Sequence, residues 1–323
     1  IMASIMKEKK GLGEVIVSPL GWVSDVAPLV NLGFTPVFVD IDLKNMSITI
    51  DNIKKAVTNK TVGVTLVHVL GFNAMSDELK KFCDDNDLFF IEDCCEAHGA
   101  KHKGDRVGIY GDVSNFSFYF GHHITSVEGG MVCTNNKELY DYAKLFRSHG
   151  MTREASSELQ EKYKLDYPDV NPLFTFAVPG YNLRNQEFNA VLGLSQLPRL
   201  QNNVEERIEN LNIWLDNLDS NKFFTEFNRK GNSNFALPLI LLKKDLEFMK
   251  KVCALLDKEG VEYRVGTAGG GNQARQPYLK KYNFIEHDLN NVNHVHDFGL
   301  YIGNHPELSN YQIETLCRKL NNV

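Results

Sequence analysis

The sequence predicts an α/β protein with a mainly parallel central sheet, helices on both faces of that sheet, and a smaller α+β domain at the C-terminal end. In the first half of the chain, short apolar runs alternate with segments of helical periodicity, which is the pattern of crossover connections between parallel strands. The length of 323 residues and the hydrophobic content of 43% suit one large and one smaller globular domain. We therefore expect a large domain over 1–205 and a small domain over 206–323.

The elements of the large domain follow from this alternation. Apolar runs predict strands at 14–17, 35–39, 62–67, 88–92, 113–118 and 130–134. Helical periodicity predicts helices at 23–32, 53–57, 77–86 and 137–148. The first ten residues have the pattern of the middle of a helix, so we expect the chain to be part of a longer protein whose N-terminal segment precedes residue 1.

The second half of the chain begins with a polar, proline-containing segment at 151–180, where we expect an irregular surface loop. A long helix is predicted over 186–218, which Pro198 could break. The segments expected after it are the strand "NFALPLILL", the amphipathic helix "DLEFMKKVCALLDKEG", the strand "VEYRVG" and the closing helix "LSNYQIETLCRKLNN". Ser309 or Asn310 is the expected N-cap of the closing helix, because either side chain can accept a hydrogen bond from a free backbone N–H group.

Composition and charge argue against several classes of protein. The net charge of −6 is wrong for a nucleic-acid partner, which needs a basic surface, although a nucleotide-linked small molecule needs only a local pocket. The six cysteines are scattered and form no Cys-x-x-Cys or Cys-x-Cys pair, so we expect a cytoplasmic protein with reduced thiols and no metal site. No apolar run approaches the length of a membrane span.

Polar residues stand where predicted strands end, which is where ligands bind in open α/β sheets. A carboxylate at the tip of the apolar run "LFFIE" is costly unless it is paired, so Asp93 is either a helix N-cap or the partner of a protonated pyridine nitrogen. Trp22 follows an early strand, and it either stacks on an aromatic cofactor or belongs to the core or an interface. Ser117 lies between two phenylalanines, and its hydroxyl could reach a phosphate group. The adjacent His122 and His123 stand where the chain turns after the same strand.

Together these residues resemble the DegT/DnrJ/EryC1/StrS sugar aminotransferases, a family of pyridoxal phosphate enzymes of fold type I. The resemblance covers nearly the whole chain. Its motifs are "PVFVDID" at 36–42, "IEDCCEAHGA" at 91–100, "FSF" at 116–118, "EGGMV" at 128–132, "RSHGM" at 147–151, "GYNLRNQEFNAVLGLSQL" at 180–197 and "GNQARQPY" at 271–278. The resemblance implies an aspartate aminotransferase-like fold, pyridoxal or pyridoxamine phosphate as cofactor, and a homodimer whose active sites are shared between subunits.

His122 is the point at which this sequence departs from most of that family. Its members normally carry a lysine after "FSF" that bonds covalently to the cofactor, and His122 occupies this position. An imidazole cannot form that bond. The phrase "HHIT" before Glu-Gly-Gly resembles a branch with the same change, the 3-dehydratases of nucleotide-linked 4-keto-6-deoxy sugars in deoxysugar and O-antigen lipopolysaccharide biosynthesis. The resemblance implies GDP-4-keto-6-deoxy-D-mannose as the substrate and glutamate as the amino donor.

The resemblance also implies roles for individual residues. His122 is the expected general base, since histidine titrates near neutral pH, and His123 has no expected catalytic role. The expected cofactor contacts are Trp22 on the ring, Asp93 on the pyridine nitrogen, Glu96 on the phenolic oxygen, and Ser117 with the partner subunit's Asn182 on the phosphate. The expected substrate-binding residues are His149, Arg184 and Arg275. The glycine-rich run 266–272 is a further candidate for a phosphate cradle, although it lacks the Gly-Lys-Ser/Thr end of a P-loop.

Three other interpretations stay open. The chain could be a nucleotide-sugar aminotransferase in which lysine has been replaced by histidine, or a non-catalytic protein that binds the sugar or the cofactor. It could also be a dehydratase coupled to a reductase. Dehydratases of that type carry an iron–sulfur cluster and a close Cys-x-Cys element in their second half, where this chain has only Cys253 and Cys317, so we expect no such cluster. The sequence does not identify the nucleotide.

Overall fold

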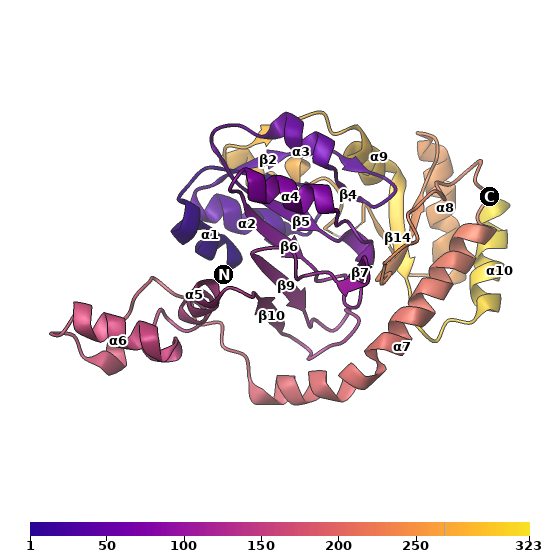
Figure 1. Ribbon diagram of the computed structural model, residues 1–323. Coiled ribbons are helices and arrows are strands. Elements are labelled where there is room, and N and C mark those ends of the chain that lie inside the picture. The colour runs from indigo at the N-terminus through magenta and orange to yellow at the C-terminus, as the bar shows by residue number, and fades with distance from the viewer. Residues whose placement is uncertain (268) are drawn as a thin grey trace.

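The computed structural model describes residues 1–267 and 269–323, and its central element is a seven-stranded sheet (Figure 1). The strands stand in the order β10 (Gly130–Cys133), β9 (Val113–Ser117), β6 (Phe89–Asp93), β5 (Thr61–Val67), β1 (Glu14–Val17), β2 (Thr35–Phe38) and β13 (Ile285–Glu286). All neighbours are parallel except β10, which runs antiparallel to β9. The expected mainly parallel sheet is confirmed, and each of its predicted strands ends within one residue of its predicted bounds.

Helices cover both faces of this sheet. They are α1 (Met2–Lys10), α2 (Val23–Leu32), α3 (Ile50–Ala56), α4 (Asp77–Asp85) and α5 (Lys137–Arg147). On one face, Ile16 of β1 packs in a buried cluster with Ile53 of α3 and Leu79 of α4. On the other face, Val15 and Val17 belong to a second cluster, which includes residues of α1 and α2. Successive side chains of a strand point to opposite faces, and both faces are covered here. All four residues of β1 are therefore buried, and after Glu14 the strand is an apolar run of three residues.

A second sheet, with three antiparallel strands, stands at the C-terminal end. Its order is β11 (Ala236–Ile240), β14 (Gly299–Gly303) and β12 (Tyr263–Val265), and α8 (Leu246–Glu259), α9 (Asn290–Phe298) and α10 (Asn310–Asn321) belong to the same part of the chain. Trp214 of α7 (Glu187–Asn217) is fully buried, and its indole N–H donates to the carbonyl of Pro238 at 2.8 Å. Ser309 is the N-cap of α10 in a capping box, which confirms one of the two predicted caps.

α7 is a single helix of 31 residues that continues through Pro198, so the expected break there is wrong. A proline in a helix leaves the carbonyl four residues earlier without its N–H partner. That carbonyl belongs to Leu194, a residue that is 66% exposed in the single chain. The helix also crosses the expected division at residue 205, and that division stays a prediction. Neither α7 nor any other helix of the described residues combines the length and the apolarity needed to cross a membrane.

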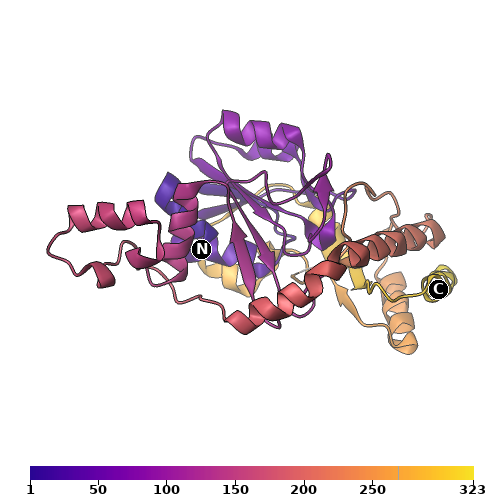
Figure 2. The same ribbon diagram turned by 60° about the horizontal axis from the view of Figure 1, so that its bottom comes forward.

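The segment 151–180 is not the irregular loop that its polar composition predicts. It holds α6 (Ser157–Asp166) between two 3-10 turns, Thr152–Glu154 and Pro172–Phe174. No residue of α6 is buried, so this helix lacks the apolar face from which a helix can be predicted. Figures 1 and 2 show α6 projecting from the rest of the molecule as an arm.

Two short hairpins, β13, α9 and β14 also escaped prediction. The hairpins are β3 (Ile41–Asp42) with β4 (Ser47–Ile48), and β7 (Lys101–His102) with β8 (Asp105–Arg106). β13 joins the large sheet beside β2 although the two strands come from opposite ends of the chain. A pairing of this kind depends on tertiary contacts, and so short a strand leaves no local pattern to read.

Candidate active site

The carboxyl ends of the parallel strands β1, β5, β6 and β9 meet at one edge of the sheet, and predicted site residues lie there. Asp93 is the last residue of β6, and Ser117 is the last residue of β9. Trp22 follows β1 as the N-cap residue of α2, with 52% of its surface exposed. The candidate site is therefore built where open α/β sheets bind their ligands.

Asp93 is held in place by two uncharged donors. Its Oδ1 accepts a hydrogen bond from the backbone N–H of Cys95 at 2.8 Å, and its Oδ2 accepts one from the side-chain amide of Asn115 at 3.2 Å. Only 7% of the residue is exposed. A nearly buried carboxylate whose bound partners are both neutral is suited to pairing with a cationic group that enters the site.

A cavity of about 440 Å³ lies beside Asp93. The polar residues of its lining include Asp25, Cys95, Asn115 and Ser117, and the apolar ones include Ile91, Met131 and Leu183. This volume, with mostly apolar walls and a few convergent polar groups, suits a small organic molecule such as a coenzyme.

Glu96 lies three residues beyond Asp93 and titrates near neutral pH. Burial, the larger cause, raises the pKa of Glu96 to about 7, even though the carboxylate accepts a hydrogen bond from the backbone N–H of Leu70 at 2.6 Å. The positive charge of Arg264 in β12 also favours the ionised form. Near neutral pH this group can therefore either donate or accept a proton.

His122 follows β9 and is close enough to Asp93 for the negative charge of Asp93 to affect its pKa. Burial lowers the pKa of His122, and the negative charge of Asp93 opposes this shift only in part. The His122 ring lies 5.3 Å from the ring of Phe235, measured between centroids, and its Nδ1 has no hydrogen-bond partner among the described residues. The imidazole is therefore neutral at pH 7 and can accept a proton.

Sequence reasoning missed His98, whose ring lies near those of both predicted histidines. Its centroid is 6.2 Å from that of His122 and 5.5 Å from that of His123. Burial, with a smaller effect from His122, lowers the pKa of His98 to about 4. His123 is buried as well, and its Nε2 donates to the carbonyl of Ser233 at 3.0 Å. The signal for His98 was its place in the same motif as Asp93, but local pattern does not reveal its neighbours.

The predicted residues Asn182, Arg184 and His149 form a group of their own. Nε of Arg184 lies 3.4 Å from Oδ1 of Asn182, and Nη2 of Arg184 lies 3.4 Å from Nε2 of His149. Asn182 and Arg184 are exposed. None of these three residues lines the cavity beside Asp93, although their neighbour Leu183 does.

Arg275 belongs neither to the cavity lining beside Asp93 nor to the cluster of Arg184 and its neighbours. Its guanidinium forms an ion pair with Asp297 at 2.8 Å, on the surface of the molecule, so its expected substrate contact stays a prediction. The glycine-rich run 266–272 includes residue 268, which lies outside the described residues.

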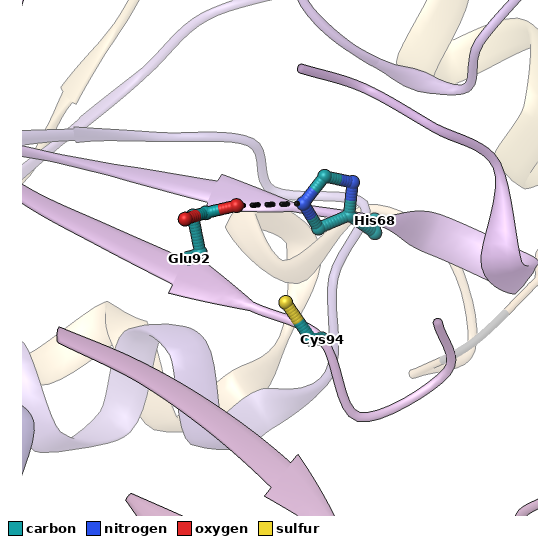
Figure 3. Close-up of side chains that lie close together, drawn as sticks. All are labelled: His68, Glu92 and Cys94. Atoms are coloured by element: carbon teal, nitrogen blue, oxygen red, sulfur yellow. Dashed lines mark hydrogen bonds and ion pairs between the residues drawn. The ribbon is translucent and has the colours of Figure 1, made fainter. Parts of the chain in front are cut away.

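A buried cluster of His68, Glu92 and Cys94 has the residue types of a metal site (Figure 3). Its imidazole is committed to other partners, however. Nδ1 of His68 accepts a hydrogen bond from the backbone N–H of Ala74 at 3.1 Å, which places the ring proton on Nε2. Nε2 then donates to Glu92 at 3.4 Å, and a protonated nitrogen cannot ligate a metal ion. The cluster is therefore explained as a structural hydrogen-bond network.

Glu92 anchors the loop that precedes β9. Its two oxygens accept backbone N–H groups from Gly108 at 2.9 Å, Tyr110 at 2.7 Å and Gly111 at 2.6 Å. Burial on its own would raise the pKa of Glu92, but His68 and these backbone donors outweigh burial and hold the pKa below its ordinary value. Such a carboxylate stabilises the fold above its unfolded-state pKa, and this stabilisation is lost as the pH falls through the folded-state pKa.

We expect Glu92→Gln to lower the free energy of unfolding by about 2 kcal/mol at pH 7, because the amide would point a donor at backbone donors. The difference between variant and wild type should shrink in acid, where the wild-type carboxylate becomes protonated. Urea unfolding of both proteins across a series of pH values measures this. A difference that stays constant with pH would show that the charge of Glu92 does not matter.

Comparison with known proteins shows which family this chain belongs to. The sequence model of the DegT/DnrJ/EryC1/StrS aminotransferase family matches residues 2–321. A GDP-4-keto-6-deoxy-D-mannose 3-dehydratase of Yersinia pseudotuberculosis is 32% identical over 312 residues, which are 96% of this chain and 79% of that protein. A GDP-perosamine synthase of Escherichia coli O157:H7 is 30% identical over 312 residues, which are 95% of this chain and 78% of that protein.

Solved structures show the same fold. The E. coli GDP-4-keto-6-deoxy-D-mannose-3-dehydratase with bound hydrated PLP matches with a TM-score of 0.88 and 28% identity, over 99% of this chain and 84% of that chain. Two further structures of such a dehydratase, each with a TM-score of 0.86 and 28% identity over 99% of this chain, contain bound GDP-perosamine (in a variant enzyme, 84% covered) and a trapped PLP–glutamate geminal diamine (85% covered). The expected fold type I is confirmed, and the structure shows it as a large, mainly parallel sheet and a small antiparallel sheet.

The residues at the strand ends fit the cofactor that these structures contain. The nearly buried carboxylate of Asp93, with only neutral partners, matches a protonated ring nitrogen. The hydroxyl of Ser117, in the same cavity, is of a type that binds phosphate oxygens. The exposed indole of Trp22 offers a flat apolar face at the same edge of the sheet.

Proposed function

Since the chain belongs to the DegT/DnrJ/EryC1/StrS aminotransferase family and is thus a pyridoxal phosphate-dependent enzyme, we propose that it is a 3-dehydratase of a nucleotide-linked 4-keto-6-deoxy sugar. The proposed substrate is GDP-4-keto-6-deoxy-D-mannose, and glutamate is the proposed amino donor. The product would be the corresponding 3-deoxy keto sugar, a precursor for lipopolysaccharide O-antigens.

The observation that carries this proposal is the presence of His122 at the position where the resemblance places the lysine of an aminotransferase. Identity alone does not separate the two activities, because a dehydratase and a perosamine synthase are almost equally similar to this chain. The chemistry of the side chain does separate them. A lysine can bond to the cofactor and return a proton to the sugar carbon that receives the amine, whereas an imidazole can only exchange protons.

When bound, pyridoxamine phosphate supplies an amine for the C4 ketone of the sugar and a ring system that accepts and returns electrons. Asp93 would hold the ring nitrogen in its protonated form, and Trp22 would lie on the face of the ring. Glu96 would meet the phenolic oxygen, and its pKa of about 7 allows it to share one proton with that oxygen. Ser117 would bind the phosphate.

His122 would supply the proton transfers. Its neutral imidazole can take a proton as a general base, and the imidazolium that results can donate a proton to the C3 hydroxyl as that group leaves as water. The electrons for the deoxygenation come from glutamate, which leaves as 2-oxoglutarate. The nitrogen is released as ammonia, so the sugar loses one oxygen and keeps no nitrogen.

We also propose that the active form is a homodimer. The first half of α7 exposes a row of large apolar side chains, with Phe188 at 62%, Val191 at 66% and Leu194 at 66%. Monomeric proteins rarely leave a continuous apolar helix uncovered. Leu183, which is 56% exposed, lines the cavity and precedes this helix, so the apolar surface reaches the candidate site. A second copy is the occupant that would also bring the partner subunit's Asn182 to the phosphate.

Charges placed on this helix should therefore separate the subunits. We expect the double variant Val191→Glu, Leu194→Glu to elute as a monomer and to bind pyridoxamine phosphate more weakly, because buried unpaired carboxylates disrupt an apolar interface. Light scattering coupled to gel filtration measures the mass. Leu246→Glu, an equally drastic change at a residue of α8 that is 61% exposed, is the matched control and should stay dimeric. A double variant that also stays dimeric would place the interface elsewhere.

The proposed activity is tested by anaerobic incubation of the purified protein with pyridoxal phosphate, glutamate and GDP-4-keto-6-deoxy-D-mannose, followed by mass spectrometry of the sugar. Loss of one oxygen with release of ammonia supports the dehydratase. A product that keeps nitrogen at C4 identifies an aminotransferase that works without its lysine. No conversion of GDP, CDP or dTDP forms of the sugar would leave a protein that only binds its ligands.

A further inference from the structure

Asp25 is a second carboxyl group at the edge of the sheet where Asp93 lies. It belongs to the first turn of α2, which begins after Trp22, and it lines the same cavity as Asp93. Only 8% of Asp25 is exposed, and no hydrogen-bond donor reaches its Oδ2 among the described residues. The Asp93 carboxylate belongs to the same cavity lining and is close enough to act on the Asp25 carboxyl and to share a proton with it.

Local packing keeps the Asp25 side chain in this place. A Cβ atom at Gly21 would stand 2.4 Å from Oδ2 of Asp25, so the carboxyl group occupies space that only a glycine leaves open. The backbone N–H of Asp25 donates to the carbonyl of Trp22 at 3.0 Å, which closes the first turn of the helix. The carboxyl group therefore points toward the strand ends instead of toward water.

Two carboxyl groups at this distance cannot both ionise readily in a buried place. Burial, followed by the negative charge of Asp93 and the hydrogen bond to it, raises the pKa of Asp25 well above its ordinary value. The other titratable groups that face Asp25 are Glu96, Cys95 and Tyr278, and none of them is a cation that would favour its ionised form. When the pair holds one proton, Asp25 is the member that carries it, because its pKa is the raised one.

We propose that Asp25 is a positioning residue of this site: its protonated carboxyl group donates a hydrogen bond to Asp93, which keeps the Asp93 carboxylate charged and oriented for the ring nitrogen of the cofactor. An ionised Asp25 could not do this, because two carboxylates would repel each other. The inference rests on the use of pyridoxal phosphate by the family and is independent of the dehydratase proposal. It would hold equally in an aminotransferase.

The proton on Asp25 can be observed directly in the protein without cofactor. Infrared difference spectroscopy detects the carbonyl stretch of a protonated carboxyl group, and Glu96→Gln removes the other carboxyl that carries a proton near pH 7. In this background we expect a protonated-carboxyl band at pH 7 that disappears when Asp25→Asn is added. If the band is absent, or survives Asp25→Asn, Asp25 is not the proton carrier and the inference is overturned.

The effect on Asp93 is tested by the affinity for pyridoxamine phosphate at pH 7. Asp25→Asn keeps a neutral donor and should match the wild type, whereas Asp25→Ala removes the donor and should bind about tenfold more weakly. If the two variants behave alike, the role of Asp25 is packing and the proposed hydrogen bond has no effect.

Discussion

His122→Asn is expected to lower the rate of sugar deoxygenation about 10²–10⁴-fold, which is the usual contribution of a positioned general base. Asparagine is close to histidine in size and polarity, but its amide does not exchange protons at neutral pH. The wild-type rate should in turn fall as the pH drops through the pKa of His122, because protonation removes the base and burial has lowered that pKa below the ordinary value. Rates of product formation at saturating cofactor and glutamate measure both effects.

Two controls separate this role from a structural one. Cofactor affinity should survive in His122→Asn, because the proposed cofactor contacts belong to other residues. His123→Asn removes the hydrogen bond to Ser233 and should lower the melting temperature with little effect on turnover. If His122→Asn keeps the wild-type rate, or if His123→Asn is the variant that loses it, the assignment of the base is wrong.

Asp93→Asn is expected to weaken binding of pyridoxamine phosphate about 10²–10³-fold, because the substitution removes the charged partner of the ring nitrogen from a nearly buried site. The amide keeps the shape of the side chain, so besides the charge only the hydrogen bonds change: those from Cys95 and Asn115, and the one proposed from Asp25. Equilibrium dialysis of the cofactor against both proteins measures the loss. Turnover should fall as well, since a neutral ring is a poorer electron sink.

The matched control is Asp112→Asn. Asp112 directly precedes β9, whereas Asp93 is the last residue of the neighbouring strand β6. Asp112 accepts a hydrogen bond from the backbone N–H of Phe90 at 2.8 Å, so it is also a carboxylate that supports β6, but it does not belong to the cavity lining. We expect this variant to bind the cofactor like the wild type. Equal losses in Asp93→Asn and Asp112→Asn would mean that both substitutions act by loosening the sheet.

The strands of the large sheet could be predicted because a strand that is buried on both faces consists mostly of apolar residues. β1 and β5 have this composition, and parallel strands that follow one another along the chain require crossover connections. Elements without that signature escaped. α6 buries none of its residues, and β13 is two residues long and is held only by its pairing with β2. Pro198 could break a helix, but α7 continues through it and tolerates the missing hydrogen bond.

The sequence by itself determined the fold class, the family resemblance and the residues that end the central strands, because apolar periodicity and motif order are local properties of the chain. Only the tertiary structure decided which groups share a site and a proton. The sequence around Asp25 and His98 does not indicate a functional role for either residue, yet the fold brings Asp25 close to Asp93 and His98 close to His122. Protonation depends on burial and on charges brought together from distant segments, as in Glu96 with its pKa of about 7, and no local pattern encodes either.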